Sequence, residues 1–287
     1  MNYRHAFHAG NFADVFKHAA LCRVLVHLRD KPAAFRVIDT HAGAGLYDLT
    51  SSEATRGGEW PDGIGRLLDA ALPQPAADLL APYLEAVRAF NPGGALRTYP
   101  GSPALAQAML RHQDRLIACE LEPHAAGALR HALRGDERAK AIEIDGWTAL
   151  SAYLPPVERR GVVLIDPPFE QEADFARLAG ALETARRKWA TGIYMLWYPI
   201  KGRPQPDALA KRMRRLGIAK LLRAELTISS MSDPTRLNGC GLVFLNPPWR
   251  LEADLSAMLP LFASLLGRDA KAGSRLDWLV GEGATSA

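Results

Sequence analysis

Cysteine is scarce in this sequence, with three in 287 residues. Cys22, Cys119 and Cys240 stand far apart, and none belongs to a Cys-x-x-Cys pair. Disulfide frameworks and cysteine-rich zinc sites both need closely patterned cysteines, so the sequence favours neither. Each cysteine lies in an apolar stretch, where we expect a small buried side chain in a reducing compartment.

Long hydrophobic runs are also missing. Proline, glycine and charged residues interrupt every apolar stretch before it reaches the length that crosses a bilayer. The first residues contain no apolar segment of the kind that a secretory signal peptide requires. We therefore expect a cytoplasmic protein with no membrane partner.

The composition is that of an ordinary globular protein, 48% hydrophobic and 23% charged. The net charge of +4 and the pI of about 9.0 are compatible with an anionic partner such as nucleic acid. Many proteins without such a partner share these values, so charge alone does not decide the question. The sequence does not fix the oligomeric state, and a monomer is favoured.

Seven short apolar runs, each bounded by turn residues, predict buried strands. They are Phe35–Asp39, Leu116–Glu120, Ala141–Asp145, Val162–Asp166, Ile193–Trp197, Leu221–Ile228 and Leu242–Asn246. Helical segments separate most of them, beginning with a helix over Ala13–Leu28 that Asn11 can cap. This alternation predicts an α/β protein with a doubly wound, mostly parallel, seven-stranded sheet. The last strand follows a short link, Ser229–Asn238, so we expect it to run antiparallel.

The interval between the first two strands is too long for a simple βαβ unit. It contains helical patterns around Ile64–Leu72, Ala77–Phe90 and Ser102–Arg111, separated by glycine and proline turns. We therefore predict a main domain of residues 1–47 and 101–287, with a helical subdomain inserted at residues 48–100.

A glycine-containing turn, Gly43-Ala44-Gly45, follows the first strand. It lacks the third glycine of the dinucleotide fingerprint, because Asp48 stands there, which counts against NAD or FAD. Glu120 ends the second strand, where a carboxylate can accept hydrogen bonds from both ribose hydroxyls of a nucleoside. Asp145 and Gly146 end the third strand and suit the edge of an adenine ring. Together these residues predict a nucleoside cofactor at the carboxyl edge of the sheet.

The most specific motif is Asp166-Pro167-Pro168-Phe169, directly after the fourth strand. The Asp166 carboxylate and the Pro167 carbonyl can accept the two hydrogens of the exocyclic amine of adenine and orient its nitrogen toward a methyl donor. The prolines fix φ and remove an N–H, which aims that carbonyl. Phe169 offers a face on which a flipped or unpaired base can stack. These residue types predict adenine-N6 methylation.

The N-terminal segment carries side chains that suit nucleotides. Tyr3 and Arg4 can stack on bases and pair with phosphates, and Lys17 and His18 follow on the first helix. A frayed tail before a packed helix explains the same residues equally well. His5 and His8 have metal-ligand spacing, but nothing completes a site, so no metal is expected.

A second acceptor-Pro-Pro-aromatic motif, Asn246-Pro247-Pro248-Trp249, follows the last strand. By local pattern it equals the motif at Asp166. An antiparallel last strand would place Asn246 at the opposite edge of the sheet from the cofactor. We therefore expect Asn246 to have a structural role.

With these residues in place, nearly the whole chain resembles the bacterial RlmJ family, methyltransferases that modify an adenine N6 of 23S ribosomal RNA. The segments that carry the resemblance are Tyr3–His5, Phe7–Asn11, Asp39–Gly45, Tyr99–Pro103, Asp166–Pro168, Leu196–Pro199 and Asn246–Trp249. The resemblance implies a Rossmann-like class I methyltransferase fold with an inserted helical subdomain, and S-adenosyl-L-methionine as cofactor. It implies cofactor contacts at Lys17, His18, His41, Gly43, Ser102, Glu120, Asp145, Gly146 and Asp166. Asp166 looks like the catalytic residue and Tyr3 like an RNA contact; Phe169 stands where the family is expected to have tyrosine.

Three alternatives remain open at this point. A DNA adenine-N6 methyltransferase would use the same motif, but should carry a target-reading domain that the short, Ala/Leu-rich insertion does not suggest. A protein-glutamine methyltransferase fits an aspartate at the first motif position less well. An RNA-binding module with a decayed cofactor site would not need Gly43, Gly45, Glu120, Asp145 and Asp166 intact.

Overall fold

A computed structural model describes residues 4–170 and 173–282. Its main sheet has eight strands in these ranges, in the order β10–β8–β9–β7–β6–β1–β4–β5. In that order their bounds are Gly273–Val280, Leu221–Thr227, Gly239–Leu245, Ile193–Ile200, Gly161–Ile165, Arg36–Asp39, Arg115–Glu120 and Ala139–Glu143. The strands β5, β4, β1, β6 and β7 pair in parallel, and β9 pairs antiparallel with both β7 and β8.

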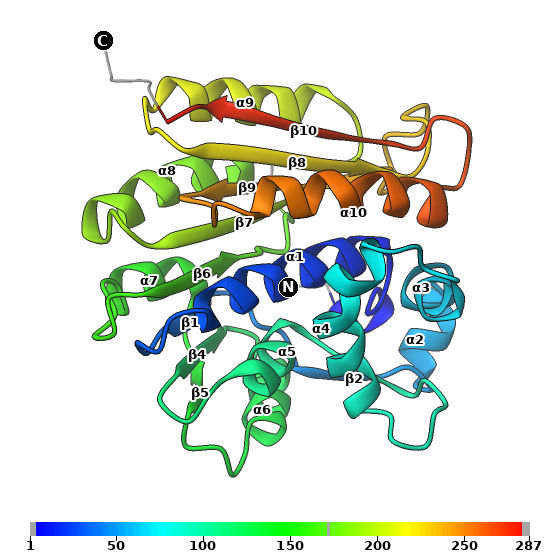
Figure 1. The fold of residues 1–287 in the computed structure, drawn as a ribbon, viewed down its shortest axis with the longest axis horizontal. Coiled ribbons are helices and arrows are strands. Elements are labelled where there is room, and N and C mark those ends of the chain that lie inside the picture. The colour runs from blue at the N-terminus through cyan, green and yellow to red at the C-terminus, as the bar shows by residue number, and fades with distance from the viewer. Residues whose placement is uncertain (1–3, 171–172, 283–287) are drawn as a thin grey trace.

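Helices cover both faces of this sheet (Figure 1). The helices of the described residues are α1 (Phe12–Arg29), α2 (Ser52–Gly57), α3 (Arg66–Asp69), α4 (Ala76–Ala89), α5 (Ser102–Met109), α6 (Pro123–Ala132), α7 (Gly146–Ala152), α8 (Ala173–Lys188), α9 (Pro204–Arg215) and α10 (Leu251–Leu266), of which α2 and α3 lie beside the sheet and not on its faces. The core on one face is formed with α1, α4, α5, α6 and α10, and the core on the other with α7, α8 and α9. The chain therefore has the doubly wound α/β architecture that the sequence predicts.

The seven predicted strands are all present, as β1, β4, β5, β6, β7, β8 and β9, and the predicted antiparallel direction of β9 is confirmed. The prediction of a seven-stranded sheet is nevertheless one strand short, because β10 adds to the edge of the sheet beside β8. Its sequence, Gly-Ser-Arg-Leu-Asp-Trp-Leu-Val, keeps only one buried position. An edge strand of this kind lacks the continuous apolar run that marks the buried strands.

Helix α1 lies between the sheet and the segment that follows β1. Asn11 caps it, accepting hydrogen bonds from the backbone amides of Ala13 and Asp14. Most of the helix is buried, as expected for a helix that is apolar on nearly all sides. Its first turns nevertheless bury three polar side chains at helical spacing: Asp14, Lys17 and His18. Buried polar and charged side chains need hydrogen-bond or ionic partners, and the partners of these three belong to the candidate active site.

The predicted insertion begins and ends at a small two-stranded sheet. Strand β2 (Leu46–Asp48) pairs antiparallel with β3 (Thr98–Pro100), and between them lie α2, a π-helical turn η2 (Pro61–Gly65), α3 and α4. The helix predicted over Ile64–Leu72 is shorter than expected, because Gly63 breaks the regular backbone and α3 ends at Asp69. Helix α4 packs on α1 and α10, and η2 packs on α1. We propose, on this pairing, that residues 48–100 form an inserted subdomain.

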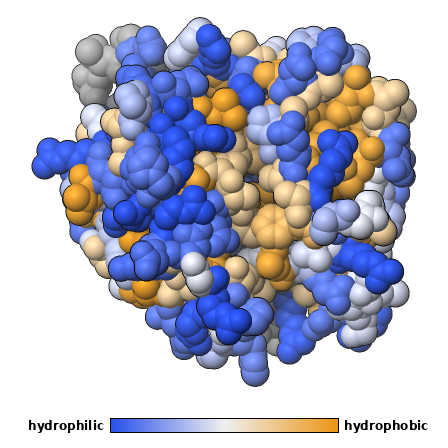
Figure 2. Space-filling model, turned by 60° about the horizontal axis from the view of Figure 1, so that its bottom comes forward, coloured by the Kyte–Doolittle hydropathy of each residue, from blue (hydrophilic) through white to orange (hydrophobic). Residues whose placement is uncertain are grey.

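The three cysteines are free and buried, as the sequence predicts. Among the helices of the described residues, none is long and apolar enough to span a membrane. Figure 2 shows apolar side chains gathered in the middle of one face, with hydrophilic groups around them. Apolar atoms cover much of the surface of any folded protein, so this pattern alone assigns no binding face.

Candidate active site

The strand register brings the predicted site residues to one edge of the sheet. Asp39, the last residue of β1, pairs with Ala118 of β4 on one side and with Leu164 of β6 on the other. Glu120 and Asp166 each stand two residues further along these flanking strands. In a doubly wound sheet, ligands bind at this position, outside the carboxyl ends of the strands where the strand order reverses.

Asp166 is paired with a buried lysine from α1. The Lys17 Nζ donates to Asp166 Oδ2 at 2.5 Å and lies 3.0 Å from Asp14 Oδ1. Burial alone would lower the pKa of Lys17, but the carboxylates of Asp166 and Asp14 together raise it well above its ordinary value. The lysine is therefore a permanent cation that holds one side of the Asp166 carboxylate.

The motif after β6 forms an extended turn that presents two acceptors and an aromatic ring. Pro167 is buried, while Pro168 and Phe169 are half-buried. Phe169 adopts a positive φ of 50°, an uncommon conformation for a residue with a side chain. Its ring centroid lies 4.8 Å from that of Phe175 and 5.7 Å from that of Trp197. The Phe169 ring thus packs against side chains of α8 and β7, and part of its surface stays exposed.

The carboxylate of Glu120 is oriented by backbone amides. Gly43 donates to Glu120 Oε2 at 2.8 Å, and Leu121 and Glu122 donate to Oε1, each at 2.8 Å. Gly43 has a φ of 62°, and a Cβ there would collide with the Tyr47 hydroxyl. The glycine turn after β1 and the acid that ends β4 are therefore joined by a hydrogen bond. Oε2, which accepts from one backbone amide, keeps acceptor capacity for a ligand.

A second close approach joins the ends of β1 and β5. A Cβ on Gly146 would collide with the Thr40 carbonyl and approach the His41 ring within 2.7 Å. The His41 Nδ1 contacts the Thr40 hydroxyl at 2.8 Å, and burial lowers the pKa of His41 to about 4, so its ring is neutral. Asp145 caps α7 by accepting from the Thr148 amide. The backbone of Gly146 therefore lies against the Thr40 carbonyl and the His41 imidazole, and a larger residue would not fit there.

Ser102 points at Asp39 rather than at open space. Its hydroxyl donates to Asp39 Oδ2 at 2.6 Å, and both residues are buried. Burial raises the pKa of Asp39 to about 7, against the opposing effect of the Ser102 hydrogen bond, and the nearby Asp166 raises it further. A carboxyl group that changes charge near neutral pH thus lies directly under the site.

His18 stands one residue after Lys17, within a buried hydrogen-bonded chain. Its Nδ1 contacts the Tyr99 hydroxyl at 2.7 Å, and Tyr99 contacts the Tyr83 hydroxyl at 2.9 Å. Burial lowers the pKa of His18 to about 3, so the ring is neutral. Its Nε2 is buried and has no hydrogen-bond partner among the described residues. An unpartnered buried nitrogen of this kind is available to a ligand.

The N-terminal segment is fastened to the predicted insertion. Tyr3, the predicted RNA contact, lies outside the described residues. The Arg4 Nη1 donates to Glu53 Oε1 at 2.7 Å, and His8 Nδ1 lies 3.0 Å from Glu59 Oε1. Arg4 remains exposed, so its predicted contact with RNA stays a prediction. In the described part of the chain, no group of three or more His, Cys, Asp or Glu side chains is placed to hold a metal ion.

The second motif, at Asn246, lies at the other end of the sheet, as predicted. Because β9 runs antiparallel to β7, its last residue pairs with Tyr194 near the start of β7. The Asn246 Nδ2 donates to the carbonyls of Ala190 and Gly192, each at 2.8 Å. Asn246 therefore ties the turn before β7 to the end of β9, away from Asp166.

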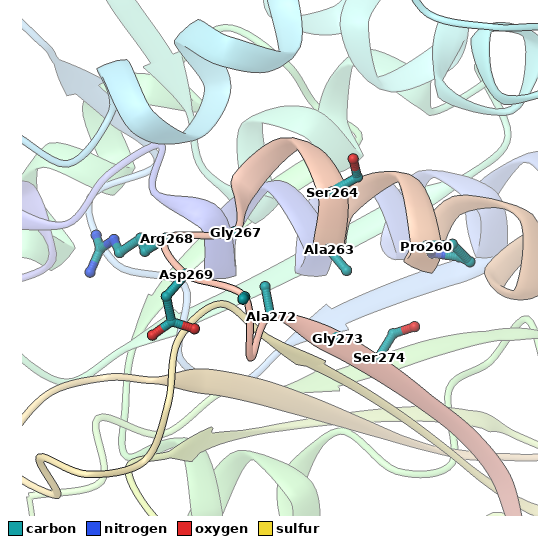
Figure 3. A pocket seen from close by; sticks show the side chains of 10 residues that line it. Pro260, Ala263, Ser264, Gly267, Arg268, Asp269, Ala272, Gly273 and Ser274 are labelled. Atoms are coloured by element: carbon teal, nitrogen blue, oxygen red, sulfur yellow. The ribbon is translucent and has the colours of Figure 1, made fainter.

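A separate hollow of about 630 Å³ lies between the end of α10 and the start of β10 (Figure 3). Small residues dominate its lining, and its charged lining residues are Arg268 and Asp269. Asp269 accepts hydrogen bonds from the backbone amides of Ser230 and Lys271, so its carboxylate stabilises the local turns. Its lining includes none of the residues predicted for catalysis or cofactor binding.

The sequence reasoning gave Asp14 no part in this site, and it counted Asp39 only as one of the acidic residues that close the first four strands. The signal for Asp14 is present in the sequence, because it stands three residues before Lys17 on a helix. The contact of Asp39 with Ser102 has no local signal, since 63 residues separate the two in the chain.

The strand order, the glycine turn after β1 and the Asp-Pro-Pro-Phe turn after β6 define a Rossmann-like methyltransferase. The family model described as "Ribosomal RNA large subunit methyltransferase D, RlmJ" matches residues 32–280. The chain belongs to this RlmJ family of ribosomal RNA large subunit methyltransferases, and it is an enzyme of that class.

Three relatives illustrate the extent of the similarity. The chain is 41% identical over 283 residues to "Ribosomal RNA large subunit methyltransferase J" of Escherichia coli K12, covering 98% of this chain and all of that protein. It is 38% identical over 284 residues to the protein of the same name from Haemophilus influenzae, again covering 98% of this chain and all of the relative. The crystal structure of protein LPL1258 from Legionella pneumophila, 31% identical, superposes with a TM-score of 0.85 and covers 94% of this chain and 98% of that one.

Proposed function

We propose that this chain transfers a methyl group from S-adenosyl-L-methionine to the N6 amine of one adenine in 23S ribosomal RNA, in the cytoplasm. The observation that carries the proposal is the position of Asp166-Pro167-Pro168-Phe169, which follows β6 beside the Gly43–Glu120 hydrogen bond. The names of the two relatives from E. coli and H. influenzae support large-subunit ribosomal RNA as the substrate.

The residues at the edge of the sheet fit this cofactor. Glu120 has a fixed carboxylate with spare acceptor capacity for the ribose hydroxyls, and Gly43 and Gly146 leave room for close approach. Asp145 can accept from the adenine amine, and the free Nε2 of His18 can meet a polar group of the cofactor. His41, Ser102 and Lys17 complete the set, with Asp166 at the boundary between cofactor and substrate. When bound, the cofactor supplies an activated methyl group on a sulfonium.

The chain's own residues then orient the amine. The Asp166 carboxylate and the Pro167 carbonyl accept hydrogen bonds from its two N–H groups, so the nitrogen lone pair points away from them, and Asp166 takes up one of these protons as the N–C bond forms. Lys17 binds one oxygen of Asp166 and leaves the second oxygen for the substrate. Phe169 supports the face of the base, a contact worth about 1–3 kcal/mol for a stacked base. Because these groups act by position, an in-line approach accounts for most of the acceleration.

The test is transfer of labelled methyl groups from the cofactor to separate pools of unmodified 23S ribosomal RNA, duplex DNA and protein. We expect label in the RNA pool alone, recovered as N6-methyladenosine after nucleoside digestion. Label in DNA would favour the alternative of a DNA adenine-N6 methyltransferase. Label in another nucleoside would overturn the assignment of the acceptor pair to adenine.

A further inference from the structure

One buried carboxylate links the N-terminal segment to the Lys17–Asp166 pair. Asp14, which is 2% exposed, accepts the Gly10 amide at 2.9 Å through Oδ2. The same oxygen lies 3.0 Å from His5 Nε2. Its other oxygen, Oδ1, lies 3.0 Å from Lys17 Nζ. The two oxygens therefore face different parts of the site.

Without Asp14, Lys17 would keep Asp166 as its one ion-pair partner among the described residues. The ammonium is almost fully buried and sits between the Asp14 and Asp166 carboxylates. A buried cation needs its counter-charges close, since their loss exposes the full cost of desolvation. Asp14 thus fixes where the ammonium lies, and through it which oxygen of Asp166 faces the substrate.

On the other side, Asp14 fixes the path of the chain before α1. Gly10 has a φ of 78°, and a Cβ there would press on Ile64 at 3.0 Å and Trp60 at 3.2 Å. Its amide is held by Asp14, and its carbonyl accepts the Ile64 amide at 2.9 Å. His5, in the short helix η1 (His5–Phe7), contacts the same carboxylate. Asp14 thereby links this segment to the site, in addition to the contacts that Arg4 and His8 make with the insertion.

We propose that Asp14 is a positioning residue for methyl transfer, which holds the N-terminal segment and the Lys17–Asp166 pair in one arrangement. The proposal rests on the proposed function, because it assigns Asp14 a part in that reaction. Asp14 acts through Lys17 and His5 and does not itself contact the reacting atoms. Its effect should therefore appear in kcat and depend on the presence of Lys17.

The experiment compares Asp14→Asn, Lys17→Gln and the double variant with the unsubstituted enzyme on 23S ribosomal RNA. Asparagine keeps the shape and can still accept the Gly10 amide, but it loses the charge. We expect Asp14→Asn to lower kcat by about tenfold or more and to leave cofactor affinity within about threefold. The double variant should be no slower than Lys17→Gln by more than about threefold, because both changes break one pathway. Independent, multiplying losses would overturn the proposal.

A matched control separates this role from helix stability. Asp254, on α10, forms an ion pair at 2.8 Å with Arg23, which lies on α1 as Asp14 does. This pair is not part of the site. We expect Asp254→Asn to keep kcat within about twofold, whatever its effect on thermal unfolding. An equal loss of kcat in Asp254→Asn and Asp14→Asn would overturn the proposal.

A second variant covers the case in which Asp14→Asn does not fold. The His5 side chain is 23% exposed, so His5→Ala removes the side-chain contact between the segment and Asp14 and leaves both the Gly10–Asp14 hydrogen bond and the Asp14–Lys17 pair in place. We expect a folded protein with kcat reduced about fivefold or more and cofactor affinity within about threefold. Unchanged kcat would overturn the proposal. Failure of the unsubstituted enzyme to methylate RNA would instead refute the proposed function, so the two failures are distinguishable.

Discussion

Lys17 Nζ lies 2.5 Å from Asp166 Oδ2, although 149 residues separate them in the chain. This contact joins the first helix to the turn after β6. It also gives the two residues different chemical tasks: Lys17 supplies fixed positive charge, and Asp166 supplies the acceptor that faces the substrate. Loss of the Asp166 carboxylate should therefore cost activity rather than folding.

Replacing Asp166 with alanine should lower methyl transfer by about 100-fold or more, within the range for a positioned proton acceptor. The fold should persist, because Lys17 keeps Asp14 as a buried partner. Transfer of labelled methyl to RNA measures the rate, and circular dichroism with thermal unfolding checks the fold. Near-normal turnover in the folded variant would remove Asp166 from the catalytic role.

Replacing Glu120 with glutamine should weaken cofactor binding by about 1.5–3 kcal/mol, the range for a hydrogen bond to a charged group. Isothermal titration with S-adenosyl-L-methionine measures the change. Glu143→Gln is the matched control, since Glu143 ends the neighbouring strand β5 and pairs at the surface with Arg130. Equal affinities for both variants and the unsubstituted enzyme would mean that Glu120 only stabilises the turn around Gly43.

Asp39 should make the stability of the enzyme depend on pH. Its folded pKa of about 7 lies above the ordinary aspartate value of 3.8. The folded state therefore binds the proton more tightly, and this contribution is fully present below pH 4 and is lost as pH rises through 7. Relative to the unsubstituted enzyme, Asp39→Asn should gain stability as pH rises from about 4 to about 7, at up to about 1.4 kcal/mol per pH unit. Denaturant unfolding across this range measures it; a constant difference would contradict the prediction.

Replacing Asn246 with alanine should reduce stability by about 1–3 kcal/mol and keep the methylation rate within about twofold. The asparagine gives up two hydrogen bonds to backbone carbonyls and a φ of 52° that alanine adopts poorly. Denaturant unfolding and methyl transfer measured on the same preparation check both parts. If a folded Asn246→Ala enzyme is inactive while Asp166→Ala is active, the two motifs have been assigned the wrong way round.

The buried centre of this fold could be predicted from the sequence because buried parallel strands consist of continuous apolar residues. Strand β6, Gly161–Ile165, is buried at every position. Strand β10 could not be found in the same way, because half of an edge strand faces solvent and its Arg275 and Asp277 break the pattern. The direction of β9 was predictable, since the short link between β8 and β9 leaves little room for a crossover helix.

The site residues likewise separate into those that have a local signal in the sequence and those whose contacts depend on tertiary packing. Glu120, Gly43, Asp145 and Asp166 are recognisable because strand ends and turns leave local marks in the sequence. Of the partners of Asp14, only Lys17 is marked in the sequence, three residues further along the same helix, whereas His5 and Gly10 reach Asp14 only once the segment before α1 has folded. Likewise, the contact between Ser102 and Asp39 spans 63 residues and depends on the close approach of α5 to β1.

The pairing of β2 with β3 has a consequence for how such chains change over evolution. Leu46 stands opposite Pro100, so the polypeptide leaves the main fold and returns to it at nearly one point. Residues can be gained or lost between these two strands without altering the order of the large sheet, provided that the surfaces facing α1 and α10 are kept. We expect differences in length among members of the family to concentrate in residues 70–75 and 91–97, which connect helices and strands at the outside of this excursion.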